Sequence, residues 1–300
     1  MGLTKRRQDQ VVLNKRKKIP LLPYLFIAPA IILFGMFTIY PFIRTFILSF
    51  TLTNKYGNPT KFVGLQMWQR TLSKKEFWDV LGVTLKIAAI NLCGTFFIAM
   101  IFALLATAPT PGGKIYQTMY ALPMAIASSP AAAIFVFIFR QKNGLLNSII
   151  GQNIAWLQNV DYAIWVVCFV TIWMHIGSSF IFLLVGFRNV PEELVESSIL
   201  DGANALQRIR HVLLPVASPQ IFFVLFLNIN SSFKSFAQIR LLTSGGPVNS
   251  TTTLIYSIYK NAMINGRFET ACIQAIFLFL LIFGITRIQF SLEKKVVHYQ

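Results

Sequence analysis

Acidic residues are scarce in this 300-residue chain, which has 10 Asp and Glu against 27 Lys and Arg. It also has only three cysteines, all within apolar stretches, and three widely spaced histidines: Cys93, Cys168, Cys272, His175, His211 and His298. This distribution disfavours a disulfide framework, a metal site built from Cys and His, and the clustered side chains that a membrane-embedded enzyme would need.

Apolar residues are abundant instead, at 55% of the chain, with a mean hydropathy of +0.61. That is more apolar surface than a soluble core of this size could bury, so the sequence predicts an all-α polytopic membrane protein. A bilayer needs about 20 apolar residues per helix, and we expect six such spans. They cover residues 20–50, 81–106, 116–139, 162–187, 216–236 and 271–290. We expect kinks or breaks at four prolines: Pro29, Pro41, Pro123 and Pro130.

Lys and Arg crowd the N-terminus in "KRRQDQVVLNKRKK", directly before the first span. Positive charge is enriched on cytoplasmic flanks, so this run predicts a cytoplasmic N-terminus, and six spans then place the C-terminus there too. An arm for nucleic acid or anionic lipid is a weaker interpretation, and we expect no nucleic-acid partner. The predicted organisation is a basic segment (1–19), a first span (20–50), an outer loop (51–80), a core of five spans (81–290) and a tail (291–300).

Residues 188–215, which we call the polar loop, interrupt this apolar pattern between the fourth and fifth spans. Pro191, Glu192 and Glu193 are typical of a first helical turn, and four aliphatic residues are spaced for partial burial: Leu194, Val195, Ile199 and Leu200. Gly202 predicts a tight, left-handed turn, with Asp201 or Asn204 as a hydrogen-bonding cap. A second short helix then leads to Pro215 and Pro219. Two helices around a glycine turn indicate a docking element.

The stretch "ESSILDGANALQRIRHVLLPVASP" closely resembles the cytoplasmic loop of bacterial ABC-importer permeases, which carries an EAA triplet, then DGA, LP and a final proline. The residues that match this pattern are Glu196, Asp201, Gly202, Ala203, Val212, Leu214, Pro215 and Pro219. Ser197 and Ser198 replace the two alanines, and Ile209 stands where Phe is usual. The resemblance implies that Glu196, Ser197, Ser198, Asp201, Gly202, Ala203, Leu214 and Pro215 couple the permease to its ATPase.

Two further stretches resemble the carbohydrate branch of this family, in particular its maltose-type and glycerol-phosphate-type first permease. They are "YLFIAPAIILFGMFTIYPFIRTFILSFT" and "LLTSGGPVNSTTTLIYSIYKNAM". The resemblance implies a type I importer in the bacterial inner membrane, with a second homologous permease, two ATPase subunits and an extracytoplasmic binding protein that delivers a sugar. The chain has no Gly-rich phosphate loop followed by Lys and Ser or Thr, so ATP should bind to the partner subunits and we expect no cofactor here.

Polar residues inside the spans indicate a candidate substrate path, because such groups are costly in lipid unless they face a cavity or a partner. One stripe lies in the fourth span and one in the fifth, each at i, i+4, i+7 spacing: Thr171, His175 and Ser178, then Asn228, Ser232 and Ser235. Hydrogen bonding between helices is the alternative explanation.

Two other classes of transport protein stay open as alternatives. A proton-coupled secondary transporter would need membrane carboxylates, yet every acidic residue falls in a loop, at a terminus or at a span edge. A channel is the other, and it would move solute without ATP.

Overall fold

The computed structural model of the chain describes residues 21–107 and 113–296 and divides it into two units, Met1–Ile47 and Leu48–Gln300. The predicted basic segment at 1–19, residues 108–112 and the last four residues of the predicted tail lie outside the described residues. In the first unit, α2 (Leu21–Phe34) continues through Pro29 without a break. A π-helical turn, η1 (Gly35–Ile39), then leads into α3 (Tyr40–Leu48). Residues 24–48 together are long and apolar enough to cross a membrane.

The π turn η1 comes directly before Pro41. Its last bond runs from the amide of Tyr40 to the carbonyl of Gly35, an i→i+5 bond in place of the usual i→i+4. Proline has no amide hydrogen and its ring crowds the preceding turn, so the helix widens there. The predicted perturbation at Pro41 is therefore confirmed, whereas Pro29 lies within regular helix.

The predicted outer loop at 51–80 is largely ordered structure. It contains the antiparallel pair β1 (Thr51–Thr53) and β2 (Pro59–Phe62), then α4 (Gln66–Leu72), and α5 begins within it at Lys75. The hydroxyl of Thr53 donates to the carboxylate of Glu269, which holds the hairpin against the start of α16.

Three further helices are long enough to span a membrane unbroken: α5 (Lys75–Thr107), α9 (Val160–Arg188) and α16 (Phe268–Val296). They cover the predicted second, fourth and sixth spans and extend beyond them. A helix can continue beyond the hydrocarbon core into the polar regions on either side. Hydrophobic windows therefore mark the centre of each helix better than its ends.

The predicted third span is broken. It consists of α6 (Gly113–Ala121), the 3-10 turn η2 (Leu122–Ala125) and α7 (Ser128–Ile138), and the two halves meet at 100°. The break falls between Pro123 and Pro130, as their missing amides predict. A short amphipathic helix, α8 (Leu145–Ile150), follows before α9.

The predicted fifth span is shorter than expected. Helix α13 (Ser218–Ser232) carries it and bends by 75° from the preceding segment, 205–216. The chain then forms α14 (Phe236–Leu242), α15 (Leu254–Tyr259) and a π turn, η4 (Lys260–Ile264), before α16. Helix α13 ends at Ser232 because Phe233 to Ser235 turn the chain into α14.

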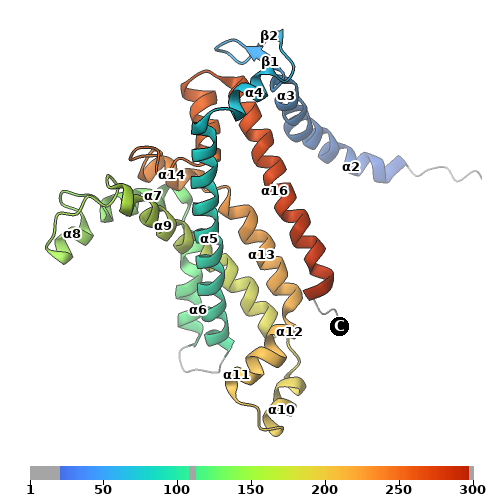
Figure 1. The fold of residues 1–300 in the computed structure, drawn as a ribbon. Coiled ribbons are helices and arrows are strands. Elements are labelled where there is room, and N and C mark those ends of the chain that lie inside the picture. The colour runs from blue at the N-terminus through green and yellow to red at the C-terminus, as the bar shows by residue number, and fades with distance from the viewer. Residues whose placement is uncertain (1–20, 108–112, 297–300) are drawn as a thin grey trace, which may run out of the picture. The chain divides into compact units, whose positions relative to one another are not determined.

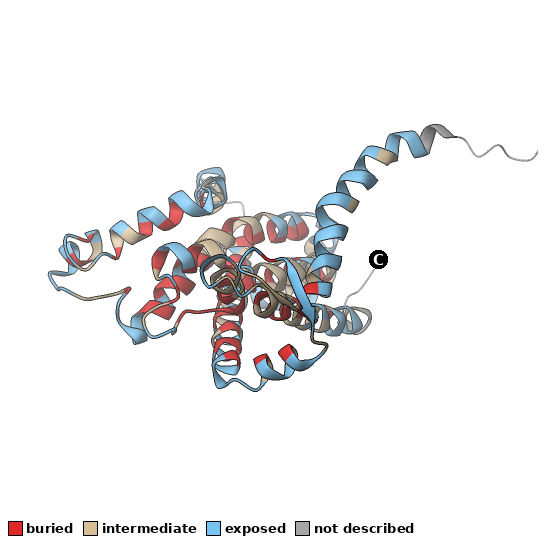
Figure 2. Ribbon diagram, turned by 90° about the horizontal axis from the view of Figure 1, so that it is seen from above, coloured by how far each residue is buried: buried red, intermediate tan, exposed pale blue. Residues whose placement is uncertain are grey.

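Small residues let α5 and α9 pack closely. Five nearly inaccessible positions recur along α5 at intervals of three or four: Ala88, Asn91, Thr95, Ala99 and Ala103. Small side chains at this spacing allow close approach of membrane helices, where lipid gives no hydrophobic drive for association. Figure 2 shows the buried positions gathered where the helices of the second unit face one another. In Figure 1, the polar loop lies at one end of this unit and β1, β2, α4 and the start of α16 lie at the other.

Candidate functional site

The first half of the polar loop is α10 (Glu192–Leu200), which begins after Pro191 at its N-cap (φ −55°, ψ 130°). Two acidic residues, Glu192 and Glu193, occupy the first turn, where the helix dipole favours negative charge. Ser198 is buried and Val195 half-buried. Of the four aliphatic residues expected to be partly buried, only Val195 is half-buried, whereas Leu194, Ile199 and Leu200 are exposed, at 40%, 51% and 89%.

A complete Schellman motif ends α10. The amide of Ala203 donates to the carbonyl of Ser198 (3.0 Å), and the amide of Gly202 donates to the carbonyl of Ile199 (3.0 Å). Gly202 has φ +80°, and no heavy atom lies within 4 Å of the position a β-carbon would take. The glycine is therefore required by backbone conformation and not by crowding, which confirms the predicted left-handed turn.

A capping box starts the second half of the loop. The side-chain oxygen of Asn204 accepts from the amide of Gln207 (2.9 Å), and the side-chain oxygen of Gln207 accepts from the amide of Asn204 (2.8 Å). Of the two predicted caps, Asn204 makes this bond. The segment continues through α11 (Ala205–Arg208), the π turn η3 (Ile209–Leu213) and α12 (Leu214–Val216).

The π turn η3 has the same cause as the one before Pro41. The amide of Leu214 bonds the carbonyl of Ile209, because Pro215 offers no amide to continue the α-helical pattern. Ala217 then separates α12 from α13 at the 75° bend. Leu214 and Pro215 are thus half-buried at the base of the loop, where the chain changes direction.

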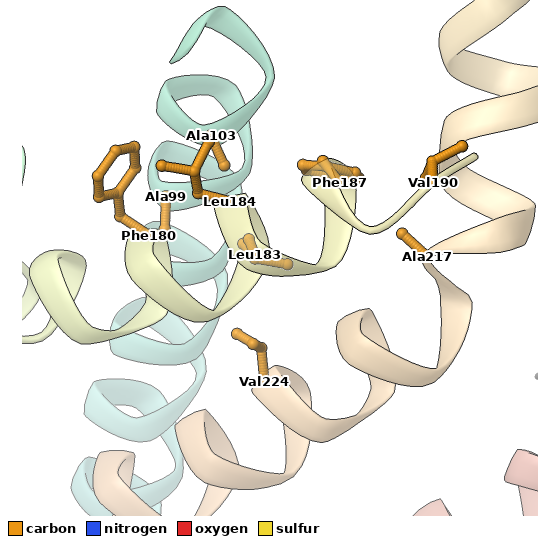
Figure 3. Close-up of a cluster of buried hydrophobic side chains, with 9 residues drawn as sticks. All are labelled: Ala99, Ala103, Phe180, Leu183, Leu184, Phe187, Val190, Ala217 and Val224. Atoms are coloured by element: carbon orange, nitrogen blue, oxygen red, sulfur yellow. The ribbon is translucent and has the colours of Figure 1, made fainter. Parts of the chain in front are cut away.

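The base of the polar loop is anchored in an apolar cluster. Val190 lies near the start of the loop and Ala217 follows its end, and Figure 3 shows both beside Phe187. Further into the bundle, Phe180, Leu183, Leu184 and Val224 join Ala99 and Ala103 of α5. At Gly186, an added β-carbon would come within 2.6 Å of Gln220, so glycine permits α9 and α13 to meet closely beside the loop. The loop is therefore fixed at both ends to the helices it connects.

A hollow of about 410 Å³ separates the two halves of the loop. Ser198, Asp201, Gly202, Ala203, Gln207, Arg208, His211 and Val212 line it. Four of the eight predicted coupling residues lie outside this lining: Glu196 and Ser197, which are exposed on α10, and Leu214 and Pro215, which are half-buried at the base of the loop. The hydroxyls of Ser197 and Ser198 bond carbonyls within α10 (3.2 and 2.6 Å), so these serines fit the family's alanine positions without an unsatisfied polar group. Sequence reasoning missed that two leucines of the loop are strongly exposed, Leu200 at 89% and Leu206 at 73%.

A second hollow, of about 230 Å³, lies between α9 and α13. His175, Ser178, Ser179, Phe182, Val224, Leu227, Asn228 and Ser231 line it. Three of the six predicted path residues are among them, namely His175, Ser178 and Asn228. Ser179, which also lines the hollow, was not predicted. The i, i+4, i+7 spacing selected the adjacent Ser178 and left Ser179 out.

The other predicted path residues lie elsewhere. Thr171 is fully buried and donates to the carbonyl of Val167 (2.7 Å), and Ser232 donates to the carbonyl of Asn228 (2.7 Å). Ser235 follows the end of α13 and stands at the N-cap position of α14 without a side-chain capping bond, so its expected place on the same helix face is wrong. These hydroxyls satisfy themselves on nearby backbone carbonyls.

Ser179 and Asn228 join the two helices across the hollow. The hydroxyl of Ser179 donates to the side-chain oxygen of Asn228 (2.8 Å), which is the interhelical bonding that the alternative explanation predicts. The amide nitrogen of Asn228 is buried and has no partner among the described residues. This one residue therefore both connects the helices and leaves a donor available at the hollow.

Elsewhere in the described chain, no group of three or more His, Cys, Asp or Glu could hold a metal ion. The comparisons with known proteins then identify the fold. Residues 99–298 match the family model described as binding-protein-dependent transport system inner membrane component. The chain belongs to this family.

This permease is most informatively compared with three proteins. It is 31% identical over 283 residues to the sn-glycerol-3-phosphate transport system permease protein UgpA of Salmonella typhimurium, covering 93% of this chain and 96% of the relative. The corresponding protein of Yersinia pestis is 31% identical over 287 residues, with the same coverage. A chain in the crystal structure of a bacterial ABC transporter that imports the acidic polysaccharide alginate superimposes with a TM-score of 0.83 at 21% identity, covering 92% and 96% of the two chains.

The family and the fold therefore confirm a multi-pass membrane permease of the type I importer class, with the ATPase on a separate subunit and no enzymatic activity of its own. The family description also names a binding protein, which is one of the predicted partners.

Proposed function

We propose that this chain is one of two related permease subunits in an ATP-driven importer that takes up a carbohydrate or a sugar or polyol derivative. Two ATPase subunits act at the polar loop, and an extracytoplasmic binding protein delivers the substrate at the opposite end. This orientation places both termini in the cytoplasm. The substrate class is supported by the relatives, which are named for sn-glycerol 3-phosphate.

The observation that carries the proposal is the construction of the polar loop. Two capped helical segments meet at a glycine turn, and Val190 and Ala217 fix both ends of the loop in the apolar cluster. A force applied to such a loop moves α9 and α13 instead of being absorbed by flexible chain. These two helices line the hollow at Asn228, so movement of the loop would change the hollow between them.

The residue roles follow from this geometry. Glu196 and Ser197 present the exposed face of α10 to the ATPase, and Ser198, Asp201, Gly202 and Ala203 form the hollow that receives it. Leu214 and Pro215 set the angle at which the loop enters α13. On the substrate path, His175, Ser178 and Asn228 have the better support, because they line the hollow. ATP remains on the partner subunits.

A proton-coupled mechanism has little support in the described chain. The acidic residues of the long helices lie near their ends, at Glu76, Asp79, Asp161, Glu269 and Glu293. A relay through the membrane would need a carboxylate near its middle.

Uptake into proteoliposomes tests the proposal. The two permeases, the ATPases and the binding protein encoded with them are reconstituted, and labelled sn-glycerol 3-phosphate and neutral sugars are offered in turn. Accumulation of one of these substrates that requires both internal ATP and the binding protein is the expected result. Transport without ATP would make the assembly a channel, and transport driven by a proton gradient alone would make it a secondary transporter.

A further inference from the structure

Two adjoining hollows lie at the end of the second unit that is opposite the polar loop, where α4 and the start of α5 face η4 and the start of α16 (Figure 1). Their volumes are about 90 and 150 Å³. Four residues line both: Thr71, Lys74, Arg267 and Thr270. We call the two together the outer pocket. Helix α5 has 33 residues, so this pocket is separated from the polar loop by roughly 50 Å of helix.

A chain of side-chain hydrogen bonds points one donor into the outer pocket. The amide nitrogen of Asn265 donates to the side-chain oxygen of Asn261 (3.1 Å), and the amide nitrogen of Asn261 donates to the side-chain oxygen of Gln274 (3.0 Å). The Ser257 hydroxyl donates to the same Gln274 oxygen (3.2 Å). The acceptor of Gln274 is therefore occupied, and its amide nitrogen remains.

That nitrogen is the free end of the network. Gln274 lines the pocket and is only 5% exposed, yet its nitrogen has no hydrogen-bond partner among the described residues. The nitrogen is accessible from the pocket, and each bond in a chain of hydrogen bonds polarises the next. The arrangement therefore offers a strengthened donor to whatever occupies the pocket.

Thr71 provides a second donor from the facing element. It lies in α4, is 5% exposed and lines both hollows, and its hydroxyl has no hydrogen bond within the described chain. Two polar groups from elements about 200 positions apart in sequence thus line one space.

Cations surround these donors. Arg70, Lys74 and Arg267 line the pocket, and none of them has an ion pair within the described chain. The acidic residues there are Glu76 and Glu269, and the carboxylate of Glu269 already accepts from Thr53. Unpaired cations with free donors favour a ligand that carries negative charge and accepts hydrogen bonds.

We propose that the outer pocket binds a small oxyanion, with a phosphate monoester as the best fit. The Gln274 amide nitrogen and the Thr71 hydroxyl donate to its oxygens, and Lys74 and Arg267 balance its charge. A neutral sugar fits less well, because it carries no charge for Lys74 and Arg267 to balance. The consequence for transport rests on the proposed function: the substrate would be acidic and would meet this pocket on delivery.

Equilibrium binding to the assembled transporter in lipid nanodiscs, without binding protein, tests the proposal. The probe is labelled sn-glycerol 3-phosphate, with glycerol as the neutral counterpart and inorganic phosphate as competitor. Four variants are compared: Thr71→Val, Gln274→Glu, Arg267→Gln and, as a control, Lys142→Gln. Gln274→Glu keeps the oxygen that Asn261 and Ser257 bond, and it replaces the free donor with a second carboxylate oxygen that carries negative charge. Lys142→Gln removes one exposed positive charge outside the pocket.

We expect saturable binding of sn-glycerol 3-phosphate that glycerol does not show. Each pocket variant should weaken it by about tenfold or more, as expected for a lost hydrogen bond or ion pair to a charged group, and Lys142→Gln should leave it unchanged. Competition by inorganic phosphate supports recognition of the phosphate group alone, and binding of the ester without such competition supports recognition of the whole ester. Thermal unfolding of each variant establishes that it is folded.

Three results would overturn the proposal: no saturable binding, equal binding of glycerol, or binding that all three pocket variants leave intact. Weaker docking of the binding protein in these variants, with no oxyanion bound, would make the pocket a protein contact instead. ATP-driven uptake of a neutral sugar alongside absent oxyanion binding would remove this inference and leave the proposed function standing.

Discussion

Gly202 is the position at which the conformation of the polar loop can be tested with single substitutions. Its φ of +80° is easy for glycine, costs about 1–2 kcal/mol for alanine, and is better tolerated by asparagine. Because nothing lies within 4 Å of the added β-carbon, crowding adds nothing to this cost. Gly202→Ala should therefore destabilise the end of α10 by about 1 kcal/mol, and Gly202→Asn by less.

Hydrogen exchange measures this cost at the amides of Gly202 and Ala203, which make the two bonds of the Schellman motif. A local loss of about 1.4 kcal/mol corresponds to a tenfold faster exchange at these amides. We expect exchange to be fastest in Gly202→Ala, slower in Gly202→Asn and slowest in the parent protein. Equal exchange in the alanine and asparagine variants would refute the left-handed turn as the reason for the glycine.

Uptake measurements on two Gly202 variants distinguish the effect of the backbone turn from the effect of charge on the loop. Gly202→Asp adds a negative charge to the hollow that Arg208 and His211 line, and we expect a protein that inserts in the membrane and fails to couple ATP hydrolysis to uptake. Gly202→Asn should keep most of the uptake, since it changes the backbone least. Uptake by the aspartate variant at the parent rate would remove the loop from the coupling mechanism.

Four other substitutions test separate contacts. Leu206→Ser should weaken binding of the ATPase by about tenfold or more in pull-down titrations, because this 73% exposed side chain can bury its apolar surface only in a partner. The thermal stability of the permease should not change. Unchanged binding would mean that Leu206 does not contact the ATPase. Asn204→Ala removes one half of the capping box and should cost about 1 kcal/mol, seen as faster exchange at the Gln207 amide, whereas Arg210→Ala should not affect that amide. Ser179→Ala leaves the Asn228 side chain without its interhelical partner and should lower the free energy of unfolding by about 1–3 kcal/mol, whereas Ser178→Ala, whose hydroxyl bonds its own helix, should change it little; equal effects would contradict the interhelical role. Gly186→Ala should crowd Gln220 where α9 crosses α13 and lower the free energy of unfolding by about 1–3 kcal/mol, measured by thermal unfolding. Adding Gln220→Gly to this variant should restore part of that stability.

Spans, turns and caps could be predicted from sequence because each depends on neighbouring residues. The left-handed Gly202, the Asn204 cap and the break between Pro123 and Pro130 all have local causes. The length of α13 could not be predicted from neighbouring residues. Hydropathy continues past Ser232, but the chain turns there into α14, which packs against α7 and α9.

The pairing of side chains from distant elements was also beyond sequence reasoning. Regular spacing grouped Ser232 and Ser235 with Asn228, whereas the structure pairs Asn228 with Ser179 on another helix. Helical periodicity gives the face of one helix but not the rotation of its neighbour. For the same reason, Thr71 and Gln274 could not be connected before the fold placed α4 beside α16.

The break in the third span has a consequence for solvent. Ala127 is extended and α7 begins at Ser128 without a side-chain cap, so the amides of Ser128 and Ser129 have no carbonyl ahead of them in the helix. Hydrocarbon cannot satisfy them, whereas water or another subunit can. At membrane depth, these two amides would therefore need water or a neighbouring subunit as their partner.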